Sequence, residues 1–111
     1  MSPSKLDRYL NILETLVDRP RKTDQIAYKT RMKQPMVKHH LVFLVANDVV
    51  EKRSSSNKQV FYAITEKGFA VFKTLRAMKY AQKLRDSLSV IDEASEVASV
   101  LLKHNPQGKK R

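Results

Sequence analysis

Residues 23–46, TDQIAYKTRMKQPMVKHHLVFLVA, and residues 49–64, VVEKRSSSNKQVFYAI, decide the fold of this 111-residue chain. Thr23 is expected to cap a helix that ends at about residue 30, because a hydroxyl can accept a hydrogen bond from a free N–H of the first turn. Pro35 is expected at the first helical position of the next helix, where its missing N–H costs nothing. The three residues between them are too few for anything but a tight turn, so the stretch predicts a helix-turn-helix.

The segment that follows predicts a β-hairpin. β-Branched and aromatic residues gather in residues 49–53 and 59–64, where Val60, Tyr62 and Ile64 alternate with Phe61 and Ala63. The serine-rich segment between the two runs, residues 54–58, consists of turn-forming residues. A basic hairpin after a helix-turn-helix predicts a winged helix-turn-helix.

Two further helices flank this unit. Ser4 and Asp7 form a capping-box pattern, and an apolar stripe follows it at helical spacing: Leu6, Leu10, Leu13 and Val17, widened by Tyr9 and Leu16. Thr65 is expected to cap a helix that runs from Glu66 to about Lys103, with Gly68 in its first turn allowing close packing. We therefore predict a mainly α chain with a small β-hairpin: a winged helix-turn-helix in residues 1–68, a long dimerisation helix in residues 69–103 and a disordered basic tail in residues 104–111.

Composition excludes several classes of protein. The chain carries 22 Lys and Arg against 11 Asp and Glu, a formal net charge of +11, which favours a polyanionic partner. It has no Cys and only two Gly, so thiolate chemistry and a glycine-rich phosphate loop are absent from the sequence. Nor does it contain an apolar run of membrane-spanning length or the apolar core of a signal peptide. We expect a cytoplasmic protein that is not an enzyme and uses no cofactor.

Positive charge is concentrated where a DNA-binding surface is expected. Between residues 19 and 39, seven basic residues face a single acidic one, Asp24. The outward arc of the third helix combines Gln34 and Lys38 with His39 and Val42, residue types that can bind base edges, phosphates or a thymine methyl group. The predicted DNA contacts of the basic turn and the third helix (residues 34–46) are Arg21, Lys22, Thr23, Arg31, Lys33, Gln34, Pro35, Lys38, His39 and Val42. Those of the wing (residues 53–59), on the backbone or in the minor groove, are Arg53, Ser55, Ser56, Asn57 and Lys58.

The adjacent histidines, His39 and His40, are not expected to bind a metal ion together. Neighbouring helical residues project about 100° apart, so the two imidazoles diverge. We predict that His40 is partly buried and that His39 faces solvent or DNA.

The last helix indicates how the chain assembles. A seam of small and apolar residues recurs at alternating spacings of four and three: Ala77, Ala81, Leu84, Leu88, Ile91, Ser95, Ala98 and Leu102. Residues 73–85 are basic without an acid among them, whereas the charges of residues 86–96 are acidic. Antiparallel pairing sets each basic block against the partner's acidic block, so the sequence predicts an antiparallel homodimer. The alternative is an intramolecular hairpin broken near Ser87–Ser89, although no Gly or Pro marks a turn there.

Residues 23–68 also resemble a known family. The pattern Leu41–Leu44 followed by Val49–Val50, and the segment YAITEKG at residues 62–68, are similar to small archaeal winged-helix DNA-binding proteins, found among chromatin proteins and transcription regulators. In one branch of this family a long C-terminal helix forms an antiparallel coiled-coil dimer. The resemblance implies double-stranded DNA and a second copy as partners, and association with the nucleoid. The alternative function is a protein-interaction adaptor of a transcription or RNA-processing complex.

Overall fold

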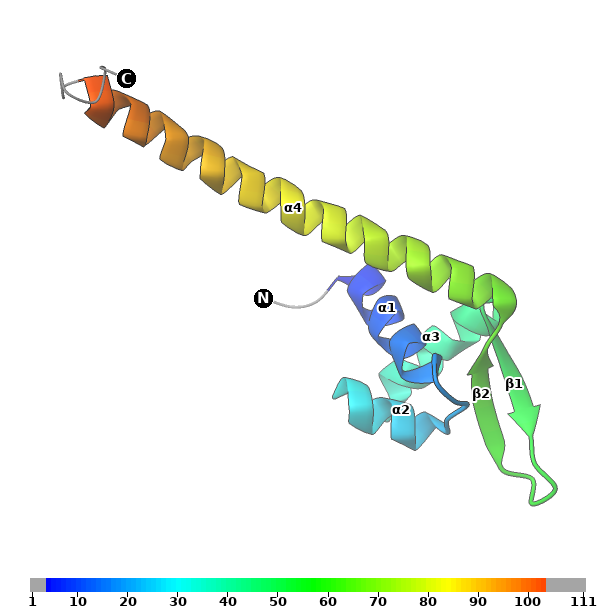
Figure 1. Cartoon of the computed structure of the whole chain (residues 1–111). Helices are drawn as coiled ribbons and strands as arrows, with labels where there is room; N and C mark the ends of the chain where they lie inside the picture. Colours follow the sequence, from blue (N-terminus) through cyan, green and yellow to red (C-terminus); the bar gives the residue numbers. More distant parts are fainter. Residues whose placement is uncertain (1–3, 104–111) are drawn as a thin grey trace. The chain divides into compact units, whose positions relative to one another are not determined.

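The computed structural model describes the backbone of residues 4–103, together with the side chains of residues 4–88, 96 and 100. The elements follow in the predicted order (Figure 1): α1 Lys5–Leu16, α2 Thr23–Thr30, α3 Gln34–Ala46, β1 Val50–Ser54, β2 Val60–Ile64 and α4 Glu66–Lys103. The chain divides into a compact unit up to Arg76 and a second unit from Ala77. The predicted winged helix-turn-helix, mainly helical with one antiparallel hairpin and a long C-terminal helix, is confirmed.

Helix α1 begins at the predicted capping box. The Ser4 hydroxyl accepts a hydrogen bond from the Asp7 backbone N–H at 3.1 Å, and the Asp7 carboxylate accepts one from the Ser4 N–H at 3.3 Å. The apolar stripe is only partly as predicted, because Leu6 and Val17 are exposed and Ile12 is fully buried. Val17 follows the last helical residue, Leu16, so it does not continue the buried stripe.

The start of α2 differs from the prediction. Lys22, not Thr23, is the N-cap: its backbone is extended, and its N–H donates to the side-chain oxygen of Gln25 at 3.0 Å. Thr23 is therefore the first helical residue, because the glutamine two positions later supplies the capping contact. Helix α2 ends at Thr30, and the left-handed backbone of the next residue, Arg31 (φ 59°), turns the chain toward α3.

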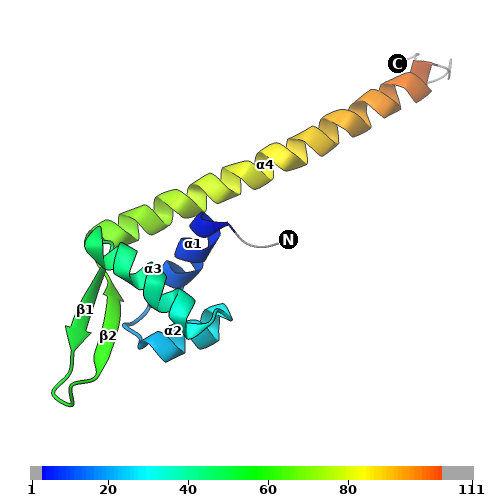
Figure 2. The same cartoon turned by 180° about the vertical axis from the view of Figure 1, so that it is seen from behind.

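Helix α3 lies between the other N-terminal helices and the hairpin (Figures 1 and 2). Pro35 is its second residue, one place later than predicted. Its buried residues are Val37, His40, Leu41 and Leu44, whereas Met36 is 41% exposed.

The hairpin is joined to the helical part by its second strand. Within the hairpin, Val50 pairs with Ile64 and Lys52 with Tyr62. On the other side of β2, the backbone of Tyr62 exchanges two hydrogen bonds with Arg21, at 2.9 and 2.8 Å. The segment between α1 and α2 therefore pairs with the hairpin like a one-residue third strand and fixes its base.

The start of α4 contacts the segment between α3 and β1. The Thr65 hydroxyl accepts from the Gly68 N–H at 2.8 Å, as expected for a cap, and also donates to the Asp48 carbonyl at 2.6 Å. Gly68 lies so close to the Val49 carbonyl that a Cβ atom there would overlap it. One turn later Phe72 is buried in the core, while Phe69 is 41% exposed. Contacts on both sides of Gly68 thus fix the first turns of α4 on the N-terminal unit.

Candidate nucleic-acid interface

The outer face of α3 is exposed at the four positions predicted from helical spacing. Gln34, Lys38, His39 and Val42 are exposed, and Val42 is 71% accessible. Residues on the opposite side of the same helix fill the core. Because one side of α3 is buried, the other side is exposed and can contact another molecule. We call its four exposed side chains, Gln34, Lys38, His39 and Val42, the ridge of α3.

Unpaired positive charge lies on this ridge and in the segment that precedes α3. We call the side chains of Lys29, Arg31, Lys33 and Lys38 the basic cluster; all four are exposed. Among the described residues, no carboxylate lies within ion-pairing distance of any of them. Because their charge is not neutralised within the protein, the basic cluster can pair with phosphates.

Three of the predicted DNA-contacting residues, before and at the start of α2, are less accessible to a partner. Arg21 has a side chain only 12% exposed, and its guanidinium donates to the Thr15 carbonyl at 2.6 Å and pairs with Asp18 at 3.3 Å. Lys22 and Thr23 are half-buried, and the Lys22 ammonium lies 6.0 Å from the centre of the Phe61 ring. Arg21 therefore serves first to hold the loop between α1 and α2.

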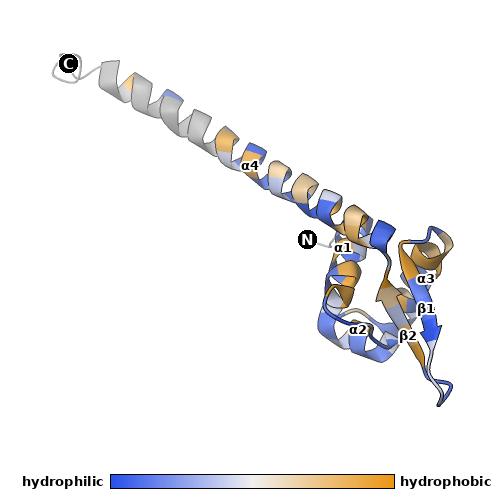
Figure 3. Cartoon of the chain, turned by 45° about the vertical axis from the view of Figure 1, so that its right-hand side comes forward, coloured by the Kyte–Doolittle hydropathy of each residue, from blue (hydrophilic) through white to orange (hydrophobic). Residues whose placement is uncertain are grey.

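The wing is polar and extends from a hydrophobic second strand, as Figure 3 shows. Ser56, Asn57 and Lys58 are exposed at its tip. The Ser55 hydroxyl accepts two backbone N–H groups within the turn, and Arg53 pairs with Glu51 at 2.6 Å. The tip residues are thus the most available of the predicted wing contacts.

Tyr28 is an exposed aromatic residue that the sequence-based prediction did not include. Its side chain is 86% accessible and lines a shallow hollow together with Lys29 and Arg31 of the basic cluster. The signal was present in the helical period, because Tyr28 lies two positions after buried Ile26 and must point away from the core. A phenol beside two cations suits contact with a sugar–phosphate chain.

His40 connects α3 to α1 and does not face solvent. It is 4% exposed, its Nε2 accepts a hydrogen bond from the Arg8 guanidinium at 3.2 Å, and Tyr9 packs edge-on at 5.1 Å. Its Nδ1 is buried without a hydrogen-bond partner among the described residues. Burial, followed by the positive charges of Arg8, His39 and Lys5, lowers the pKa of His40 below its ordinary value of 6.5.

We expect the stability of the folded chain to fall as the pH drops below neutral, because of this imidazole. The unfolded chain binds a proton at His40 near pH 6.5, whereas the folded chain binds it only at lower pH, so acidification favours unfolding. Urea midpoints measured at about pH 7.5 and about pH 5.5 test this. The difference between the two urea midpoints should be smaller in His40→Gln, which keeps an acceptor for Arg8. It should be unchanged in the exposed-site control His39→Gln. An equal decrease in both variants contradicts the role of His40.

The described part of the seam predicted for dimerisation is exposed. Ala77, Ala81, Leu84 and Leu88 are all accessible, with Leu84 at 46% and Leu88 at 56%. The side chains of Ile91, Ser95, Ala98 and Leu102 lie outside the described residues. The helical backbone is continuous through Ser87–Ser89, so the predicted alternative of a break there is wrong.

Metal-binding and membrane-spanning features are absent from the part of the chain that the structure describes. It contains no cluster of three or more His, Asp or Glu placed to hold a metal ion. None of the described helices combines the length and apolarity that crossing a membrane requires.

Comparisons with known proteins agree with this architecture. A family model described as winged helix-turn-helix matches residues 4–83. Among solved structures, the DNA-binding protein Sso10a-2 from Sulfolobus solfataricus is similar with a TM-score of 0.68 and 16% identity, over 86% of this chain and 96% of that one. The transcriptional regulator BldR from the same organism has a TM-score of 0.65 and 20% identity, over 90% of this chain and 73% of that one. Diamide-treated YodB from B. subtilis has a TM-score of 0.58 and 29% identity, over 63% of this chain and 72% of that one. The comparison with curated proteins finds no match.

Proposed function

Because the chain belongs to the winged helix-turn-helix family, we propose that it is a homodimeric DNA-binding protein, acting as a transcription regulator or a chromatin-associated protein. The observation that carries this proposal is the basic cluster, four cations without ion-pair partners among the described residues, around the exposed face of α3. Similar solved structures include a DNA-binding protein and transcriptional regulators, which supports the same function. We expect the protein to associate with the nucleoid in the cytoplasm.

In the proposed complex, α3 enters the major groove of double-stranded DNA. Gln34, His39 and Val42 then face base edges. Arg31, Lys33 and Lys38 meet the flanking phosphates. The hairpin reaches the neighbouring backbone or minor groove through Asn57 and Lys58. Arg21 contributes indirectly, by holding the loop that precedes α2.

The proposed dimer forms through α4 in an antiparallel arrangement. Support comes from the exposed apolar residues Leu84 and Leu88 and from the separation of basic and acidic blocks along the helix. The 38 residues of α4 measure about 57 Å at ~1.5 Å per residue. An antiparallel pair can therefore hold two winged units farther apart than the ~34 Å between adjacent major-groove half-sites. We propose that the dimer binds widely spaced sites, bends DNA or bridges two segments.

Titration of labelled duplex DNA at two salt concentrations, followed by fluorescence anisotropy, tests the function. We expect binding at micromolar concentration or below that weakens steeply as salt rises, because each phosphate contact releases a counterion. If an unrelated competitor duplex does not displace the labelled DNA, the protein is a sequence-specific regulator. If all duplexes compete equally, it is a chromatin protein. Absence of binding at low salt contradicts the proposal and leaves the adaptor function; footprints of half-sites one helical turn apart contradict the proposed spacing.

A further inference from the structure

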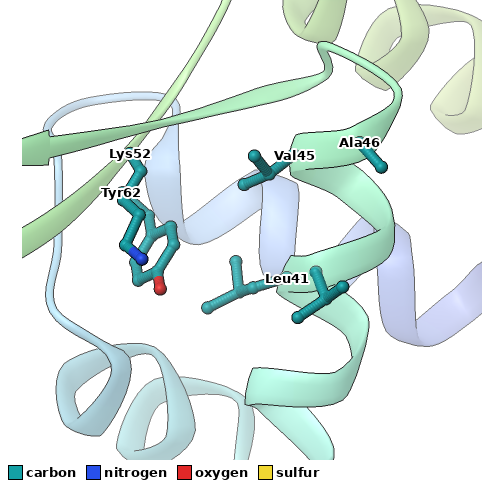
Figure 4. Close-up of a pocket in the computed structure, with 6 residues that line it drawn as sticks. Leu41, Val45, Ala46, Lys52 and Tyr62 are labelled. Atoms are coloured by element: carbon teal, nitrogen blue, oxygen red, sulfur yellow. The ribbon is translucent and has the colours of Figure 1, made fainter.

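An open groove runs between α3 and the hairpin, beside the face of α3 that is proposed to meet bases. It has a volume of about 230 Å³ and is drawn in Figure 4. Its walls are apolar side chains of α3 and two longer side chains of the hairpin: Leu41, Val42, Val45, Ala46, Lys52 and Tyr62. Neither Lys52 nor Tyr62 was among the contacts predicted from the sequence.

The two hairpin residues place polar groups together at one side of the groove. Lys52 and Tyr62 are directly paired across the two strands, and their side chains extend side by side toward Leu41 and Val45 (Figure 4). Within the described part of the chain, neither the ammonium nor the phenol hydroxyl has a hydrogen-bond or ion-pair partner. The groove therefore offers a cation and a hydroxyl donor above an apolar floor.

The position of this groove identifies its occupant, given the proposed function on which this inference rests. The major and minor grooves of a duplex are separated by one sugar–phosphate strand. If α3 occupies the major groove and the hairpin tip lies at the adjacent minor groove, that strand passes between α3 and the hairpin. A strand of this kind combines an anionic phosphate with an apolar deoxyribose, which matches the two parts of the groove.

We propose that the groove holds the DNA strand that separates the two grooves. The Lys52 ammonium and the Tyr62 hydroxyl donate to one of its phosphates, and Val45 and Ala46 lie against the adjoining sugar. These contacts make Lys52 and Tyr62 positioning residues, which set the angle of the winged unit on the duplex without reading a base.

The dimensions of the groove favour a strand over an enclosed small molecule. Small-molecule sites typically measure about 300–1,000 Å³ and bury most of their ligand. This groove is smaller, and Val42 in its wall is 71% exposed. A polymer that passes across it, held mainly by contacts elsewhere, needs no enclosure.

The test compares Lys52→Gln and Tyr62→Phe with Lys67→Gln, an exposed lysine on α4, in the DNA titration described above. We expect Lys52→Gln to weaken binding roughly fivefold to tenfold at 0.1 M salt and to reduce the salt slope by about 0.9, the value of one phosphate contact. Tyr62→Phe keeps the ring and the two backbone bonds to Arg21, so it should fold normally; we expect a loss of about threefold to tenfold. Lys67→Gln should change neither quantity.

A duplex with a single neutral methylphosphonate identifies the phosphate itself. The modification, moved one position at a time, should weaken wild-type binding where it removes a charge from the strand between the two grooves, and it should have no further effect on Lys52→Gln at that position. Full wild-type affinity and an unchanged salt slope for Lys52→Gln overturn the inference while leaving the proposed function intact. Failure of the wild-type chain to bind any duplex overturns the proposed function instead.

Discussion

Gly68→Ala is expected to lower the free energy of unfolding by about 3 kcal/mol or more, which corresponds to a fall in melting temperature of roughly 12–24 °C for a domain of this size. A Cβ atom at this position overlaps the Val49 carbonyl oxygen and comes within 2.9 Å of the Ile64 side chain. The carbonyl belongs to the backbone at the start of the hairpin, and it also accepts a hydrogen bond from the Thr65 N–H at 3.1 Å. Relief of the overlap must therefore move α4 or the hairpin as a whole.

The sign of this effect distinguishes packing from helix propensity. Propensity alone predicts that replacing a helical glycine by alanine stabilises a helix by up to about 1 kcal/mol. Ala70→Gly, at an exposed position two residues later in α4, is the matched control and should cost only about that amount. Thermal and urea unfolding of both variants measure the difference. A Gly68→Ala protein as stable as the wild type contradicts the close contact between α4 and the hairpin.

Replacement of Lys33 and Lys38 together by glutamine is expected to weaken duplex binding roughly 50- to 100-fold at 0.1 M salt. Each phosphate contact contributes about 0.9 to the slope of log affinity against log salt, so the double variant should lose about 1.8 from that slope. Both lysines are exposed and lack ion-pair partners among the described residues, so their removal leaves no buried charge behind and the fold should persist. Anisotropy titrations over a series of salt concentrations give both quantities.

Lys67→Gln is the control for this pair as well. The substitution removes the same charge from an exposed helix position. Lys67, however, lies two residues after Thr65, whose hydroxyl donates to the Asp48 carbonyl, just beyond the C-terminal end of α3. Lys33, in contrast, precedes the first residue of α3. If Lys67→Gln weakens binding as much as one of the α3 substitutions does, the effect reflects net charge and not the helix-turn-helix surface.

Sequence patterns predicted the order of elements because each one depends on interactions close along the chain. The Ser4–Asp7 capping box, the serine-rich turn and the alternation around Tyr62 are all local. The outward arc of α3 follows from the 3.6-residue period, so the spacing of Gln34, Lys38 and Val42 was enough to place them on one exposed face. The same period places Tyr28 on the exposed face of the short α2, opposite buried Ile26.

Sequence patterns did not show which polar groups are held by partners within the protein. Arg21 is a basic residue before a helix, but its guanidinium is held by Thr15 and Asp18 and its backbone pairs with Tyr62. Arg53 is likewise paired, with Glu51. Thr23 is not a cap, because the Gln25 side chain reaches the Lys22 N–H instead. Neighbouring polar side chains compete to accept hydrogen bonds from the free N–H groups at the start of a helix. Residue types alone do not show which side chain accepts.

The sequence by itself determined the winged helix-turn-helix, the concentration of positive charge between residues 19 and 39, and the exposed ridge of α3, since composition and periodicity are properties of short segments. Only the tertiary structure decided which cations remain unpaired, why Gly68 must lack a side chain, and where Lys52 and Tyr62 meet α3. The last two features depend on atoms brought together from segments far apart in the chain. Their distances are set by packing of the whole unit, which no local pattern encodes.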